Sequence, residues 1–293
     1  MTRRELFATP LSLARTGQFI KGICGGIFPA AMPLEEQFKQ AKNAGFDAIE
    51  FRMGGQADIT TPPDQARRLA EAARKTGVMI ASIWVSEMFS KSPLNHPDPA
   101  VRSQGVEGLR KVIGLARELE CGSVLVVPGR VGSGAKFMYG YQETWDRVSA
   151  ELRKVVPDAE KARVCITPEN VWNKFLVSPL EMRAFVDQFR SPWIQVHFDV
   201  GNIMQWGYPQ DWILTLGPRI KRVHLKDFKL SDRAEQGKFV DLLEGDVDWK
   251  AVMAALKKTG YHGPLSPEYA AKPDQPDRLM QISKAVDKIL AMA

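Results

Sequence analysis

The sequence predicts a single (β/α)8 TIM barrel of the α/β class. Three observations support this fold. The chain has 293 residues, eight short apolar runs alternate with amphipathic stretches, and a carboxylate or imidazole residue ends four of those runs. A barrel of this kind typically needs roughly 250 residues. Repeated alternation of strand and helix implies a parallel sheet, whose functional residues gather at the carboxyl ends of its strands.

The apolar runs are short enough to be buried parallel strands, and a stretch of helical period follows each of them. We expect strands over residues 20–24, 48–51, 79–84, 123–127, 164–169, 194–200, 220–225 and 264–268. No shift in composition divides this region. The sequence therefore predicts one catalytic domain over residues 20–293.

The stretches between the strands have the spacing of amphipathic helices, as Val101, Leu109 and Val112 show. We expect helices over residues 34–44, 64–76, 98–118, 142–156, 179–190, 210–216, 249–259 and 276–292. Glycines at the helix-to-strand turns favour helix C-caps, and they are Gly45, Gly77, Gly122 and Gly260. Two long polar segments, residues 129–141 and 228–246, predict loops on the carboxyl face of the barrel.

The composition is that of an ordinary globular protein, with 44% apolar and 25% charged residues. No apolar run approaches the ~20 residues that span a membrane. The net charge is +6, but the basic residues are scattered and do not form a cluster with interleaved aromatics. We therefore expect neither a membrane partner nor a nucleic acid partner. Three cysteines without a Cys-x-x-Cys motif are consistent with a reducing compartment.

The first 19 residues form a separate leader in this interpretation. Arg3 and Arg4 resemble a twin-arginine export signal, but Arg15 interrupts the apolar stretch that follows. A working signal usually has ~7–15 uninterrupted apolar residues. We therefore expect a vestigial leader and a cytoplasmic protein, with periplasmic export as the alternative.

Four ligand-type residues end four successive strands in the second half of the chain. They are Glu169, Asp199, His224 and Glu268. Carboxylates buried at the ends of barrel strands would be costly without a cation. One solvated acid at a strand end is ordinary, whereas four such residues on successive strands indicate a site for one divalent metal with mostly oxygen ligands.

These residues belong to motifs that resemble the xylose isomerase-like, sugar phosphate isomerase/epimerase superfamily of TIM barrels. The motifs are Gly45-Phe46-Asp47-Ala48-Ile49-Glu50, Pro168-Glu169-Asn170, Asp199-Val200-Gly201-Asn202, Val223-His224-Leu225-Lys226-Asp227 and Ser266-Pro267-Glu268-Tyr269. The segment from Asp199 to Trp206-Gly207 is especially similar to the pentulose-phosphate 3-epimerase branch. The superfamily also includes ketose 3-epimerases and hydroxypyruvate isomerases.

The resemblance implies that the four residues bind one metal, commonly Mn²⁺, with Mg²⁺, Co²⁺ or Zn²⁺ as alternatives. It also implies that Glu169 and Glu268 act as acid and base on a sugar or sugar phosphate. Many sugar epimerases of the group have a histidine where this chain has Asn202. Asparagine cannot titrate, so the identity of the substrate stays open.

Further residues near the predicted strand ends are candidates for substrate binding. They are Asn202, Lys226, Trp84, Glu50, Arg130, Trp172 and His197. Each has a plainer interpretation: Glu50 as a partner of a loop cation, Trp84 as a core aromatic, and His197 as a buried residue one layer deeper. Relatives often form oligomers, so a homo-oligomer is also expected.

Four functions are weighed against these residues. The first is an isomerase or epimerase that moves a proton through an enediolate. The second is a metal-dependent lyase or hydratase on 3-keto sugars or glycosides, because the same proton removal begins β-elimination. An abasic-site endonuclease would bind three zinc ions with several histidines. This chain has only 4 histidines, and Asn202 stands where one expected histidine ligand would be. A non-catalytic sugar-binding barrel leaves four ligand-type residues unexplained.

Overall fold

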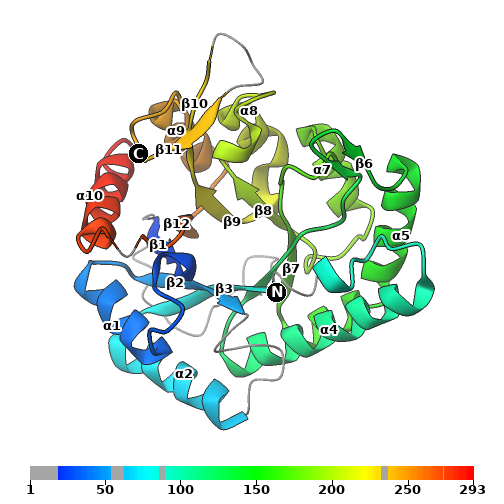
Figure 1. The fold of residues 1–293 in the computed structure, drawn as a ribbon, viewed down its shortest axis with the longest axis horizontal. Coiled ribbons are helices and arrows are strands. Elements are labelled where there is room, and N and C mark those ends of the chain that lie inside the picture. The colour runs from blue at the N-terminus through cyan, green and yellow to red at the C-terminus, as the bar shows by residue number, and fades with distance from the viewer. Residues whose placement is uncertain (1–18, 54–62, 86–89, 232–236, 273) are drawn as a thin grey trace, which may run out of the picture.

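The computed structural model describes residues 19–53, 63–85, 90–231, 237–272 and 274–293. At its centre lies an eight-stranded sheet in the order β7-β4-β3-β2-β1-β12-β9-β8. The neighbouring strands are parallel. Isolated bridges from Ile166 to Ile194 and from Glu169 to His197 join the two ends of the sheet. Figure 1 shows the helices arranged around the strands, so the predicted TIM barrel is confirmed.

The barrel strands agree with the prediction to within two residues at each end. They are β1 (Ile20–Cys24), β2 (Ala48–Met53), β3 (Met79–Val85), β4 (Ser123–Val126), β7 (Cys165–Pro168), β8 (Val196–Asp199), β9 (Ile220–Leu225) and β12 (Pro264–Pro267). Around them lie α1 (Leu34–Asn43), α2 (Pro63–Thr76), α4 (Pro99–Glu118), α5 (Tyr141–Arg153), α6 (Val156–Ala162), α7 (Pro179–Asp187), α8 (Pro209–Leu216), α9 (Trp249–Lys258) and α10 (Arg278–Leu290). In the part of the chain that the structure describes, short 3-10 turns are η2 (Gly25–Ile27), η3 (Gly201–Ile203) and η4 (Gly217–Arg219).

The hydrophobic core lies between the strands and the surrounding helices. Ile23 and Ile49 of the strands and Phe38 of α1 are fully buried. The ring of Phe198 on β8 stacks against Trp212 of α8. Since alternate strand residues face opposite sides, the neighbours of these apolar residues point into the barrel. The alternation therefore places the polar side chains of the strands inside the barrel.

The predicted helix over residues 142–156 corresponds to α5, and a further helix that was not predicted, α6, begins at Val156. Pro157 lies in the first turn of α6, where its missing N–H costs nothing but where it could not continue α5. The turn before β4 also differs from the prediction, because Glu120 and not Gly122 adopts a left-handed conformation, with φ 55°. Gly45, with φ 82°, is confirmed as the left-handed residue after α1.

The two predicted loops each contain a short antiparallel hairpin. Residues 129–141 hold β5 (Gly132–Ser133) and β6 (Lys136–Phe137). The second hairpin pairs β10 (Asp227–Lys229), which begins one residue before the predicted loop 228–246, with β11 (Lys238–Val240). Strands of two or three residues are too short to show an alternating pattern. The buried Asp227 anchors the second loop, because its carboxylate accepts bonds from Leu243 N at 2.8 Å and Trp249 Nε1 at 3.0 Å.

The predicted leader lies outside the described residues apart from Phe19. The export interpretation therefore stays a prediction. Among the helices that the structure describes, none is both long and apolar enough to cross a membrane.

Candidate active site

The four ligand-type side chains converge at the carboxyl end of the barrel. Glu169 follows β7, Asp199 ends β8, His224 lies on β9 and Glu268 follows β12. One ligand atom from each lies within 4.8 Å of those of the other three. His224 Nδ1 is 3.1 Å from Glu169 Oε1, 3.4 Å from Glu268 Oε2 and 3.7 Å from Asp199 Oδ2. The imidazole nitrogen thus faces all three carboxylates.

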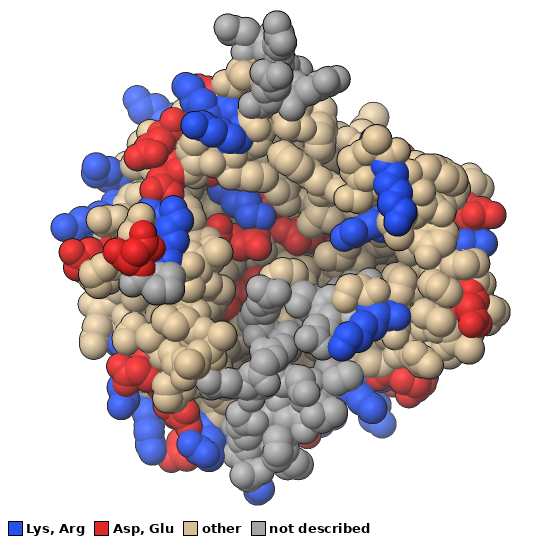
Figure 2. All heavy atoms as spheres, viewed as in Figure 1, with Lys and Arg blue, Asp and Glu red and all other residues tan. Residues whose placement is uncertain are grey.

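One lysine partly balances this cluster. Lys226 Nζ lies 2.9 Å from Asp199 Oδ2 and 2.5 Å from Glu268 Oε2. Figure 2 shows acidic side chains gathered beside a basic one in the hollow at the centre of this face. The position of Lys226 fits the predicted contact with an anionic group, because its ammonium lies at the site itself.

The pKa values of the two glutamates in the cluster shift in opposite directions. Burial raises the pKa of Glu169 to about 7, although the hydrogen bond to His224 and the charges nearby act against it. Burial also raises the pKa of Glu268, but the hydrogen bond with His224 and the charge of Lys226 outweigh it, so the net shift is strongly downward. A pair of carboxyl groups driven apart in this way is typical of acid–base sites.

Two asparagines fix the backbone around Asp199. Asn170 Nδ2 donates to Asp199 O at 2.8 Å, and Asp199 N donates to Asn170 Oδ1 at 2.8 Å. Asn202 N donates to Asp199 Oδ1 at 2.8 Å, and its Nδ2 donates to Asn170 O at 2.9 Å. The side-chain amide of Asn202, a predicted substrate contact, is therefore engaged with the protein. Sequence reasoning missed Asn170, whose only signal was its place next to Glu169.

Aromatic side chains from separate segments form one wall beside the acidic cluster. Trp172 donates from Nε1 to Asn202 O at 2.7 Å, and its ring lies against those of Phe239 and Trp206 at 5.1 and 5.9 Å. Lys226 Nζ lies 5.7 Å from the centre of the Phe239 ring. Sequence reasoning missed Phe239, because it lies on β11 in what looked like a polar loop.

A cavity of about 170 Å³ adjoins the cluster. Its lining includes Glu50, Trp84, Glu268 and Tyr269. The position of Trp84 fits its predicted role as a wall of the pocket. Glu50 is 3% exposed, and its Oε1 lies 2.8 Å from His224 Nε2, so among the described residues it pairs with a site residue and not with a loop cation.

The remaining predicted residues lie further from the cluster or beneath it. His197 is 0% exposed and its ring centre lies 4.1 Å from that of His224, a position that favours the interpretation as a buried residue. Burial and the neighbouring charge of His224 lower its pKa well below the usual value. Arg130 is exposed, and its carbonyl accepts a bond from Asn95 Nδ2 at 2.8 Å.

The donor set fits a divalent cation. Three carboxylates and one imidazole offer hard oxygen ligands and one nitrogen, and Asp199 is fully buried. The structure places several negative groups around a small volume, where uncompensated charge is costly. The residues present therefore match the chemistry of a mononuclear metal site.

Comparison with known proteins agrees with this geometry. The family model for the xylose isomerase-like TIM barrel matches residues 38–289. The L-ribulose-5-phosphate 3-epimerase UlaE of Escherichia coli O1:K1 is 29% identical over 277 residues, which cover 91% of this chain and 93% of that protein.

Solved structures of two other epimerases share the fold. An L-ribulose 3-epimerase superimposes with a TM-score of 0.77 at 23% identity and covers 94% of both chains. The D-psicose 3-epimerase of Clostridium cellulolyticum H10 gives a TM-score of 0.78 at 16% identity, over 94% of this chain and 99% of the other. At these identities the likeness concerns the fold alone.

Proposed function

Because this chain belongs to the xylose isomerase-like TIM barrel family, we propose that it is a divalent-metal-dependent 3-epimerase of a ketose or ketose phosphate. The observation that carries the proposal is the convergence of Glu169, Asp199, His224 and Glu268 within 4.8 Å. The curated relatives that match over most of their length are named as L-ribulose-5-phosphate 3-epimerases, which supports a ketose-type substrate.

The four converging residues would hold the cation through three carboxylate groups and His224 Nδ1. A bound divalent ion would polarise the ketose carbonyl and acidify the adjacent C–H bond. We infer Mn²⁺ as the preferred ion, with Mg²⁺, Co²⁺ and Zn²⁺ as alternatives, because the donor set is mostly oxygen with one imidazole.

Glu169 and Glu268 then perform the proton transfer in this proposal. They come from β7 and β12, which are not neighbours in the sheet, and they approach His224 Nδ1 from separate strands. One carboxylate removes the proton beside the carbonyl, and the other returns a proton to the opposite face of the same carbon. The ammonium of Lys226 lies beside both Asp199 and Glu268, where it would stabilise negative charge that develops on the sugar oxygens.

The aromatic wall and the cavity would shape the rest of the substrate pocket. Trp84 lines the cavity with Glu268, and Trp172 with Phe239 lies on the side of Lys226. Flat apolar surfaces of this kind pack against the C–H faces of a sugar while the polar groups fix its hydroxyls.

The experiment that tests this function is NMR in D₂O with a panel of ketoses, ketose phosphates and 3-keto glycosides, with Mn²⁺ removed before detection. We expect deuterium at a single carbon, with the carbon skeleton and the number of oxygens unchanged. Dehydrated products or a released aglycone would instead establish the lyase, and no exchange with any compound would contradict proton-transfer chemistry on these sugars.

A further inference from the structure

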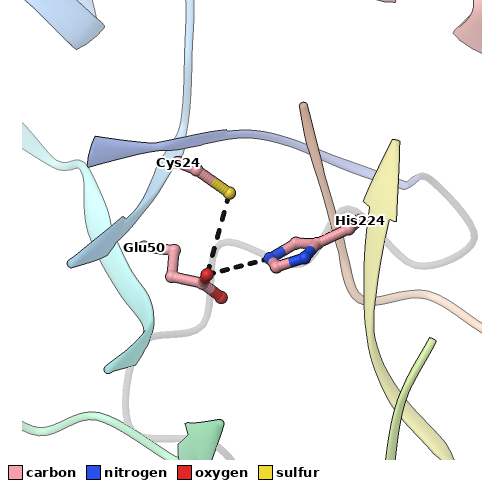
Figure 3. Close-up of side chains that lie close together, drawn as sticks. All are labelled: Cys24, Glu50 and His224. Carbon is pink, nitrogen blue, oxygen red and sulfur yellow. Dashed lines mark hydrogen bonds and ion pairs between the residues drawn. The ribbon is translucent and has the colours of Figure 1, made fainter. Parts of the chain in front are cut away.

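Glu50 of β2 contacts one of the candidate metal ligands, His224, and is not part of the proposed acid–base pair. Its Oε1 lies 2.8 Å from His224 Nε2, and its side chain is 4% exposed. The other ring nitrogen of His224 lies 3.1 Å from Glu169 Oε1. Figure 3 shows the Glu50 carboxylate pointing at the imidazole, with Cys24 on its other side. His224 is thus held by carboxylates at both nitrogens.

The strands on either side of β2 hold the Glu50 carboxylate in place. Cys24 of β1 is paired with Glu50 in the sheet, and its Sγ lies 3.7 Å from Oε1. Ser82 of β3 is paired with Glu50 on the other side, and its Oγ donates to Oε2. The register of β2 and β3 shifts between Ile49 and Glu50. Irregularities of this kind re-aim a side chain and are common next to active sites.

The contacts of Glu50 are those of a hydrogen-bond acceptor. Its Oε2 accepts a hydrogen bond from the Ser82 hydroxyl, and its Oε1 lies 2.8 Å from His224 Nε2. The Nε2 atom of His197 lies 3.7 Å from Glu50 Oε2. A carboxylate accepts hydrogen bonds, so in this 2.8 Å contact the Nε2 atom of His224 is the donor.

The tautomer of His224 follows from this contact. An imidazole that binds a metal is neutral and carries one proton, and the hydrogen bond made by one nitrogen decides which nitrogen is free to bind the metal. With the proton on Nε2, the lone pair of Nδ1 points at the three carboxylates. We propose that Glu50 is a positioning residue that fixes the Nε2–H tautomer and the ring orientation of His224. This inference rests on the proposed metal site.

The test measures the dissociation constant of Mn²⁺ by titration calorimetry of the full-length, metal-stripped protein. We expect Glu50→Ala to weaken binding by ~10–100-fold, the range for lost carboxylate–histidine–metal contacts. Glu50→Gln should lose less, because its amide oxygen still accepts a bond from Nε2–H. Ser82→Ala removes the hydroxyl that holds Oε2, and a smaller loss in the same direction is expected even where Glu50→Ala does not fold.

A matched control is Glu151→Ala on α5. Glu151 is also a buried carboxylate, with Arg102 Nε 2.9 Å from its Oε1, but it lies outside the site. This variant should lower the melting temperature and leave the Mn²⁺ dissociation constant unchanged. A structural role of Glu50 alone would produce the same pattern in the Glu50 variants.

Nitrogen-15 NMR of the Zn²⁺-loaded protein gives an independent readout. The His224 ring should show a protonated Nε2 in the wild type, and this proton should exchange faster with water in Glu50→Ala. An unprotonated Nε2 in the wild type, or unchanged affinity in both Glu50→Ala and Ser82→Ala, would overturn the inference. A second bound ion that is lost in Cys24→Ser would also overturn it, since Glu50 would then be a ligand itself. A wild-type protein that binds no metal would instead reject the proposed function from which the inference starts.

Discussion

Buried charges occur near both ends of the barrel, but they are balanced in different ways. Near the amino ends of the strands, Lys21 bonds to Ser283 at 2.8 Å and Asp287 at 2.6 Å, and Arg222 donates to the carbonyl of Ala81 at 2.6 Å. Each of these cations has partners supplied by the protein itself. The protein alone therefore compensates the buried charges of Lys21 and Arg222.

At the carboxyl end of the barrel, the protein does not fully compensate the buried negative charge. Glu169, Asp199 and Glu268 share the positive charges of Lys226 and His224. Burial raises the pKa of Glu169 to about 7 and also raises that of Asp199, which means that these neighbours do not fully offset the cost of burying the negative charge. The comparison indicates that a functional site lies where the protein's own groups leave buried charge incompletely compensated.

The largest expected effect is on turnover when a proton-transfer group is removed. Glu169→Gln and Glu268→Gln should each reduce kcat by ~10²–10⁴-fold, the usual contribution of a general acid or base. Rates should be measured at saturating Mn²⁺, because glutamine is also a weaker ligand. Glu143→Gln on α5, whose side chain is 59% exposed, is the control. Wild-type turnover in either metal-saturated site variant would contradict the assignment.

The next largest effect is a loss of folding stability when the buried lysine at the carboxyl end is replaced. Lys226→Met leaves Asp199 and Glu268 without their ammonium partner, and loss of one member of a buried charge pair costs about 3–5 kcal/mol. The free energy of unfolding of the metal-free protein should fall by this amount, and saturating Mn²⁺ should restore part of it. Chemical denaturation measures both values. Lys229→Met, at a 51% exposed side chain, should change the free energy of unfolding little. An equal loss in this variant would show that the effect at Lys226 does not come from burial of its charge pair.

The pH dependence of the metal-free protein sharpens the comparison. The pKa of Glu169 is raised from 4.5 to about 7, so the folded state holds a proton that the unfolded state releases. Stability from this group is full below pH 4.5 and is lost as the pH rises through about 7, by at most about 3 kcal/mol. Glu169→Gln should flatten the slope in that window. A wild-type slope that persists unchanged in the variant would assign it to other groups.

The smallest effect is expected at the amino end. Lys21→Met removes a buried ammonium whose carboxylate partner, Asp287, has a 60% exposed side chain, so the loss should be about 1–2 kcal/mol. The dissociation constant of Mn²⁺ should not change, because the partners of Lys21 lie on α10. Thermal unfolding and calorimetric titration check the two statements separately. A weakened metal site would show that the two ends are coupled.

The sequence could predict the barrel and the four ligand-type residues for one reason. Period, strand length and the position of a polar residue at the end of an apolar run are local properties, and the barrel topology brings those ends together. Contacts across the barrel are not local. Glu50 was proposed as a substrate contact, and its pairing with His224, 174 positions away in the chain, appears only in the structure.

The loops show the same limit. Asp227 shapes the segment after β9 by accepting backbone and indole N–H groups, and that segment brings Phe239 against Trp172. A polar composition predicted a loop but gave no indication of which side chain would return to the site. Asn202 was proposed to bind substrate from its position after Asp199, whereas the structure engages its amide with Asn170.

The most direct test of the central claim is a measurement of bound metal. Metal-stripped protein should take up about one Mn²⁺ per chain in calorimetric titration, with elemental analysis after dialysis as the check on stoichiometry. Lys21→Met should keep that ion, and Asp199→Ala should lose it. If the variant with alanine at Glu169, Asp199, His224 and Glu268 still binds one ion per chain, these four residues do not form the metal site.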